Sequence, residues 1–119
     1  AQNAAEHGAE WTRPSLPNGL ALDGAGRFVI PDVGAREIRR LDPSTGAIET
    51  WHSQVDGRPL GIVNFVLVDA VGRTWFTVTT DCADPLDAMN GRIADGYIGV
   101  IDEYGIRIVA DGFCGTNEL

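Results

Sequence analysis

"GLALDGAGRFVI" at residues 19–30 and "FVLVDAVGRTWFT" at residues 65–77 share one pattern, and that pattern decides the fold. Each stretch has an apolar run, an Asp, two linking residues, a Gly-Arg pair and a second apolar run. Glycine supplies the positive φ of a tight hairpin connection, and Asp bonds the backbone of its own turn. Each stretch therefore predicts two strands joined by a short turn. The two turn aspartates, Asp23 and Asp69, lie 46 residues apart.

A second pair of strands is predicted after each hairpin. The turn "DPSTG" divides residues 37–51, and the turn "DEYG" divides residues 97–112. Each unit then has four short strands in meander order, and a period of about 40–50 residues with four strands per unit is typical of a β-propeller blade. The alternative is a single antiparallel sandwich whose hairpins are alike only because turns are alike. The match extends to residues outside the turns, which favours the propeller.

Composition sets limits on the class of protein. The chain has 119 residues, of which 44% are hydrophobic and 22% charged, so it can bury one modest core. Its 15 glycines and 6 prolines favour many turns between short strands. A net charge of −8 argues against nucleic acid as a partner. No stretch reaches the roughly 18–20 apolar residues that span a bilayer, so we expect no membrane partner either.

Three asparagines occupy equivalent places in the repeat. Asn18 and Asn64 each stand five residues before a turn aspartate, and Asn117 in "GTNEL" has the register of Asn18 in "LPNGL". The first strand of every propeller blade lines the central channel, so the three asparagines are predicted to ring one end of it. Amide oxygens completed by carboxylates suit a hard cation such as Ca²⁺. The alternative is that each Asn only caps a turn at the start of its strand.

The chain resembles a known family over about residues 15–119, in order. The resemblance is carried by "LPNGLALDGAGRFVIPDVG", "GRPLGIVNFVLVDAVGRTWFTVTT" and "ADGYIGVIDEYGIRIVADGF" with "TNEL", which are similar to the SMP-30/gluconolactonase family. Members of that family are six-bladed propellers that hold a divalent cation in the channel and hydrolyse lactones or related esters. The resemblance implies an all-β fold, a six-bladed β-propeller, of which this chain supplies about two blades plus the first strand of a third.

The expected organisation follows from that layout. Residues 1–15 form a lead-in that could end a preceding blade, residues 16–57 one blade, residues 59–112 a second blade with an inserted rim loop at 79–94, and residues 113–119 the first strand of the next blade. Six blades need roughly 270–300 residues, and two blades cannot close a ring. We therefore expect the chain to be part of a propeller. Either a second polypeptide completes it, or copies of this chain self-associate.

The resemblance also implies a metal site. Asn64 and Asn117 match the asparagines whose amide oxygens bind the cation, which is Ca²⁺ by first choice, with Zn²⁺, Mn²⁺ or Mg²⁺ as alternatives. The family's further ligands, a Glu and an Asp that also acts as catalytic base, have no counterpart, since Glu6 and Glu10 lie in a Gly/Ala-rich lead-in. The implied function is metal-dependent hydrolysis of a small-molecule lactone or ester, with the base outside this chain. The alternative is a non-catalytic propeller scaffold of the strictosidine synthase-like or NHL type.

Three residues are candidates for substrate contact. Asn18 belongs to the asparagine ring, Asp81 begins an acidic run in the rim loop, and Glu118 stands where many relatives have Gly. Phe65 and Ile62 also depart from the family, at positions where relatives have Asp and a substrate-contacting Arg. These departures leave the substrate open, and a sugar-acid lactone is one candidate.

The two cysteines are predicted to lie at the same end as the asparagines. Cys82 is in the rim loop, and Cys114 is in the connection that leads to Asn117. A bridge between them would tie the loop to the rim and indicate an oxidising compartment. Two separate thiols in a cytosolic protein are the alternative, and the sequence leaves both open.

Overall fold

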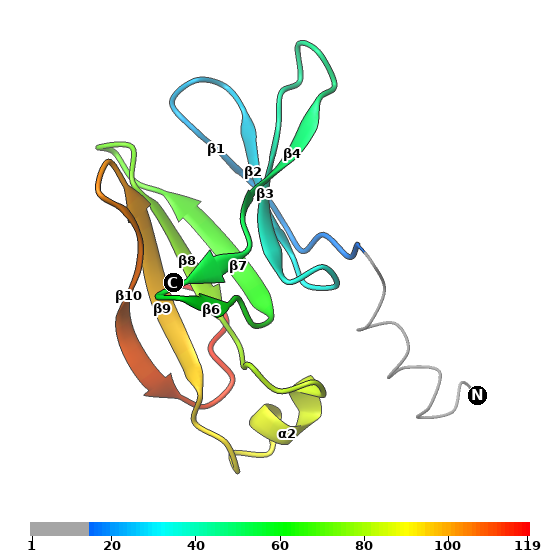
Figure 1. Cartoon of the computed structure of the whole chain (residues 1–119), viewed down its shortest axis with the longest axis vertical. Helices are drawn as coiled ribbons and strands as arrows, with labels where there is room; N and C mark the ends of the chain where they lie inside the picture. Colours follow the sequence, from blue (N-terminus) through cyan, green and yellow to red (C-terminus); the bar gives the residue numbers. More distant parts are fainter. Residues whose placement is uncertain (1–14) are drawn as a thin grey trace, which may run out of the picture.

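The structure is a computed structural model that describes residues 15–119. These residues form two four-stranded antiparallel sheets and a two-stranded hairpin (Figure 1). Sheet 1 has the order β1-β2-β3-β4 and sheet 2 the order β7-β8-β9-β10, so chain neighbours are also sheet neighbours. The strands are β1 (Ala21–Leu22), β2 (Phe28–Asp32), β3 (Glu37–Leu41), β4 (Ile48–His52), β5 (Gln54–Val55), β6 (Arg58–Pro59), β7 (Val63–Val68), β8 (Thr74–Val78), β9 (Gly96–Asp102) and β10 (Gly105–Phe113). This mostly β, four-strand meander arrangement agrees with the prediction. Glu6 and Glu10 lie outside the described residues.

The repeated motif forms the same turn in both sheets. In each, the Asp carboxylate accepts hydrogen bonds from the backbone N–H groups two and four residues later. It also accepts from the Arg side chain, at 2.8 Å for Arg27 Nε to Asp23 and 2.7 Å for Arg73 Nε to Asp69. The glycine before each Arg has a positive φ, 79° at Gly26 and 88° at Gly72. The motif is thus a self-contained turn in which Asp, Gly and Arg each have a separate part.

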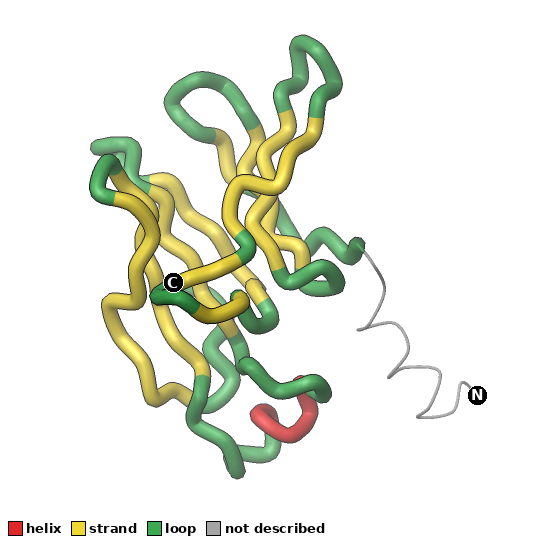
Figure 2. Tube along the Cα trace, viewed as in Figure 1, coloured by secondary structure: helices red, strands yellow, loops and turns green. Residues whose placement is uncertain are grey.

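The core lies between the two sheets. Val29 and Ile38 come from sheet 1, and Val66 and Phe76 from sheet 2, all at most 4% exposed. The β5–β6 hairpin, which joins the sheets in sequence, adds Val55 of β5 to the same core, and Leu60 joins it directly after β6. Strands β1 and β2 of sheet 1 contact β7 of sheet 2, and Figure 2 shows the two groups of strands side by side. The burial of apolar surface between the sheets is what holds them together.

The rim loop contains a short helix that the sequence reasoning did not predict. Helix α2 (Pro85–Met89) begins with Asp84 as N-cap, whose side chain accepts a hydrogen bond from the Leu86 N–H group (Figure 2). A Pro in the first turn favours this start, because its missing N–H is not needed there. Among residues 15–119, no helix is long and apolar enough to cross a membrane.

The C-terminal segment differs from the prediction of a strand at 113–119. Strand β10 continues to Phe113, and residues 114–119 of the described chain form no strand. A strand requires the backbone of a partner strand, whereas the carbonyl groups of Thr116 and Asn117 accept hydrogen bonds from the side chains of Thr79 and Thr77. The assignment of the ranges to propeller blades stays a prediction.

Candidate functional site

A cavity of about 450 Å³ brings together three segments that are distant in the sequence. Its lining residues are Asn18, Gly19, Asn64, Phe65, Asn117 and Glu118. Asn18 precedes β1, Asn64 lies near the start of β7, and Asn117 and Glu118 follow β10. All three asparagines of the repeat therefore meet at one site, together with Glu118. Their roles as ligands remain predictions.

Hydrogen bonds link the asparagines to one another and to β8. The Nδ2 atom of Asn18 donates to the backbone oxygen of Asn64 at 2.9 Å and to its Oδ1 atom at 3.1 Å. The Nδ2 atom of Asn64 donates to Oγ1 of Thr79 at 3.2 Å, and that hydroxyl donates to the Thr116 carbonyl oxygen at 2.8 Å. Since every member is held by its neighbour, the half-buried Asn64 presents its amide in one defined orientation.

Two threonines of this network were missed by the sequence reasoning. Thr77 and Thr79 are buried, and their hydroxyls hold the carbonyl groups of Asn117 and Thr116. The only available signal was the polar end of "TWFTVTT" on an otherwise apolar strand. Threonine is common in strands for its branched Cβ alone, so that signal does not single out these hydroxyls.

Asp32 holds the segment that carries Asn18. Its carboxylate, which is 0% exposed, accepts from Ser15 Oγ at 2.7 Å, from the Leu16 N–H at 2.8 Å and from the Ala35 N–H at 2.9 Å. Burial by itself would raise the pKa of Asp32, but these hydrogen bonds and the Arg39 guanidinium outweigh it, and the pKa lies below its ordinary value. Asp32 therefore anchors residues 15–18 beside the cavity. It is a further residue that the sequence did not indicate.

Asp81, the predicted substrate contact in the rim loop, does not line this cavity. Its carboxylate lies 3.5 Å from Arg58 Nη1, and its backbone N–H donates to Asp95 Oδ2 at 3.0 Å. Burial raises the pKa of Asp81; Asp95 adds to the rise, while Arg58 and Arg36 oppose it. The structure thus places Asp81 in a separate charged cluster at the base of the rim loop.

Arg36 ties the start of the rim loop to sheet 1. From the β2–β3 turn, its Nη1 atom donates to the Asp81 carbonyl at 3.1 Å and its Nη2 atom to the Cys82 carbonyl at 2.5 Å. Its backbone has a φ of 56°, in the left-handed region that non-glycine residues seldom adopt. A strained residue that makes charge-assisted bonds across two sheets is well suited to positioning a loop.

We expect Arg36→Ala to loosen the rim loop. Loss of these bonds removes about 1–2 kcal/mol of local stability, which corresponds to roughly 5- to 30-fold faster amide exchange at residues 81–95. Hydrogen exchange followed by mass spectrometry measures the change. Arg92→Ala, at an exposed Arg within the same loop, is the matched control and should leave exchange unchanged. Equal exchange in the two variants would show that Arg36 does not position the loop.

The two cysteines are free thiols in the structure. Cys82 is half-buried, with its Sγ atom 3.8 Å from Asp95 Oδ2, and Cys114 is exposed. The sequence left open a disulfide bridge or two separate thiols, and the structure has two separate thiols.

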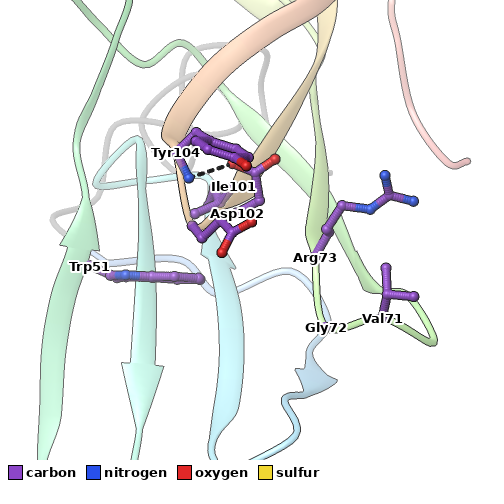
Figure 3. Close-up of a pocket in the computed structure, with 8 residues that line it drawn as sticks. Trp51, Val71, Gly72, Arg73, Ile101, Asp102 and Tyr104 are labelled. Carbon is purple, nitrogen blue, oxygen red and sulfur yellow. Dashed lines mark hydrogen bonds between the residues drawn. The ribbon is translucent and has the colours of Figure 1, made fainter.

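A larger cavity, of about 580 Å³, lies at the other end of the strands (Figure 3). Trp51 of β4 stands on one side of it, Arg73 on another, and Asp102, the last residue of β9, on a third. Two of its charged residues are already paired, Arg73 with Asp69 at 2.7 Å and Asp102 with Arg107 at 2.8 Å, and Glu103 is the remaining charged residue that lines it. This cavity therefore offers few unpaired groups to a ligand. The asparagine cavity, where polar side chains converge, is the better candidate site.

No protein-family model matches the sequence, and no curated protein matches it either. Solved structures do. One is a protein assigned as a gluconolactonase, with a TM-score of 0.63 and 16% identity over 80% of this chain and 34% of that chain. Another is a gluconolactonase from Xanthomonas campestris, with a TM-score of 0.64 and 23% identity over 82% of this chain and 34% of that chain. The chain shares the fold of gluconolactonase structures.

That likeness concerns the fold alone, and the chain spans about a third of the length of either structure, 34% in both cases. The residues that could hold a cation must therefore be judged on their own chemistry. Within residues 15–119, no group of three His, Cys, Asp or Glu side chains is placed to hold a metal. The asparagine cavity instead offers amide oxygens and one carboxylate, that of Glu118.

Proposed function

We propose that this chain is part of a six-bladed β-propeller hydrolase that acts on a lactone or related ester with the help of a divalent cation. The observation that carries the proposal is the convergence of Asn18, Asn64 and Asn117 on one cavity. The fold shared with gluconolactonase structures supports it. Amides that converge from equivalent positions of a repeat fit a site at one end of a propeller channel.

The donor set of the cavity fits an oxygen-seeking cation in part. Amide and carboxylate oxygens are the ligands that Ca²⁺ prefers. Zn²⁺ prefers histidine nitrogen and cysteine sulfur, and no His or Cys lines this cavity. Ca²⁺ takes about 6–8 oxygens, so water and residues outside this chain would complete the shell. The Oδ1 atom of Asn64 now accepts a hydrogen bond from Asn18. That oxygen has a second lone pair, with which it could bind a cation while the bond from Asn18 is kept.

The residues of this chain would have distinct tasks. Asn64, oriented by Thr79, and Asn117, whose backbone is held by Thr77, would hold the cation. A bound cation supplies Lewis-acid polarisation of the carbonyl group and stabilises the oxyanion. Asn18 and Glu118, at the exposed rim of the same cavity, would bind polar groups of the substrate.

Among the described residues that line this cavity, Glu118 has the one side chain that could act as a base, and we assign it to the substrate, so the general base would come from outside the described chain. A partner polypeptide or further copies of this chain would complete the propeller. The net charge of −8 argues against nucleic acid as a partner, because a nucleic-acid backbone is itself negatively charged.

Hydrolysis of δ-gluconolactone, followed by proton release against a protein-free blank, tests the proposal. The sample is the assembly as isolated, with its composition determined by native mass spectrometry. We expect turnover that a chelator abolishes and Ca²⁺ restores. In Asn64→Ala, half-maximal activity should require roughly 10- to 100-fold more Ca²⁺.

The control variant is Asn90→Ala, at the exposed C-cap of helix α2 and outside the cavity. Its Ca²⁺ dependence should match that of the unaltered protein. If a chelator leaves turnover unchanged, the metal role is wrong. If turnover never exceeds the blank while Ca²⁺ still binds, the non-catalytic propeller scaffold replaces the hydrolase.

A further inference from the structure

The free polar atoms of the asparagine cavity are mainly hydrogen-bond acceptors. The Nδ2 atom of Asn18 carries two N–H groups and donates to two oxygens of Asn64, at 2.9 Å and 3.1 Å. Asn64 donates from its own Nδ2 atom to Oγ1 of Thr79 at 3.2 Å. An amide whose nitrogen is bound to the protein leaves its carbonyl oxygen for a ligand, and that oxygen can only accept. Asn18 and Asn64 therefore suit a ligand that donates hydrogen bonds.

Glu118 adds a negative charge to these acceptors. Among the described residues that line the cavity, it is the one with a charged side chain, and it is exposed. An ionised carboxylate accepts hydrogen bonds and donates none. No arginine of the described residues lines the cavity, so residues 15–119 do not supply the planar donor fork that binds a carboxylate or phosphate best. The chemistry on this side of the cavity favours donors and positive charge over anions.

Sheet 2 fixes the place of Glu118 beside the asparagines. The two residues before Glu118 lie outside any strand, yet side chains hold both of them. The Thr116 carbonyl oxygen accepts a hydrogen bond from Thr79 Oγ1 at 2.8 Å. The Asn117 carbonyl oxygen accepts one from the hydroxyl of Thr77. Both donors are buried, so water does not compete for these bonds, and the charge of Glu118 is kept at the cavity.

We propose that Glu118 is a specificity-determining residue. It favours a lactone or ester whose group beside it is a hydroxyl or an ammonium, and it disfavours one with a carboxylate or phosphate there. Glu118 would thereby narrow the substrate class of the proposed function, on which this assignment rests. Two like charges about 4 Å apart oppose binding roughly 5-fold in water, and more where water is displaced. Because Glu118 is exposed, its effect lies near the lower end and weakens with added salt.

A matched pair of lactones tests this choice. D-Glucono-γ-lactone is neutral, and D-glucaro-γ-lactone carries a carboxylate where the first has a terminal hydroxymethyl group. The value of kcat/KM is measured for both, with the assembly as isolated and saturating Ca²⁺, in the unaltered protein, Glu118→Gln and Glu103→Gln. Glu103→Gln is the control, because it removes the same charge at an exposed residue that lines the other cavity. Any groups that other segments add to the asparagine cavity are the same in all three proteins.

We expect Glu118→Gln to raise kcat/KM for the charged lactone, relative to the neutral one, by about 5- to 10-fold at low ionic strength. Glu103→Gln should leave this ratio unchanged. The gain should shrink at about 1 M salt, where the screening length falls to about 3 Å. A second readout needs no turnover: ligand-observed NMR measures the binding of neutral D-glucitol and anionic D-gluconate. In Glu118→Gln, the ratio of their affinities should shift toward D-gluconate by a similar factor.

Three results would overturn the proposal. The first is an unchanged ratio in Glu118→Gln, and the second is an equal rise in Glu103→Gln. The third is a higher Ca²⁺ requirement in Glu118→Gln without a change of ratio, which would make Glu118 a ligand of the cation. If no lactone is turned over but Glu118→Gln still shifts binding toward D-gluconate, the proposed function fails and the charge selection by Glu118 stands.

Discussion

We expect Gly99→Ala to destabilise the fold by about 3 kcal/mol, the upper end for overpacking by a single methyl group. A Cβ atom at residue 99 would lie 2.1 Å from Cζ and 2.4 Å from Cε1 of Phe76, its cross-strand neighbour. Phe76 is 0% exposed and makes an edge-to-face contact with Tyr97, with ring centroids 6.5 Å apart. The ring lies in the core between the sheets, so it has no free space into which it could move.

Urea unfolding followed by tryptophan fluorescence measures this effect. Gly24→Ala is the matched control, since a Cβ atom there has no neighbour within 4 Å, and it should change the free energy of unfolding by less than about 0.5 kcal/mol. Phe76→Leu should cost less in the Gly99→Ala background than in the unaltered chain, because the smaller side chain relieves the clash. A Gly99→Ala variant as stable as Gly24→Ala would show that the Phe76 ring is not confined.

Asp32→Ala is expected to cost about 3 kcal/mol, because it leaves several part-buried hydrogen bonds without their acceptor. The carboxylate binds Ser15, Leu16 and Ala35 and lies 3.5 Å from Arg39. Asp42→Ala is the comparison, since the Asp42 carboxylate accepts its hydrogen bonds from Ser44 within an exposed turn, and it should cost about 1 kcal/mol. Urea unfolding of the two variants measures the difference. Similar losses of unfolding free energy in the two variants would show that Asp32 stabilises the fold no more than a carboxylate in an exposed turn does.

The same carboxylate makes stability depend on pH. The pKa of Asp32 in the folded state lies below its ordinary value of 3.8. A depressed pKa contributes stability that is present above the ordinary value and is lost as the pH falls through the lower, folded-state value. The advantage of the unaltered chain over Asp32→Asn should therefore be full above about pH 5 and shrink as the pH falls through 3.8 and below. If the stability difference between the two proteins stayed constant down to pH 2, it would come from the shape of the Asp32 side chain and not from its charge.

The sequence by itself determined the local elements of this fold. The turns at Asp23 and Asp69 share hydrogen bonds that span at most four residues, so the motif contains what the turn needs; Trp75 Nε1 adds one more bond to Asp69, from six residues away. The alternation of turns and short apolar runs likewise predicted two four-stranded meanders. The repeat offset placed Asn18 and Asn64 in equivalent registers, and their side chains do meet.

Only the tertiary structure decided which groups surround the site. The bond from Arg36 to the carbonyl of Asp81 spans 45 residues, and the one from Thr77 to Asn117 spans 40. Asp81 was predicted beside the substrate, and the structure pairs it with Arg58 on the β5–β6 hairpin, from which Val55 joins the core. Such contacts depend on how the two sheets and the connecting hairpin pack. That packing is set by the summed burial of many apolar side chains, so no short stretch of sequence contains it.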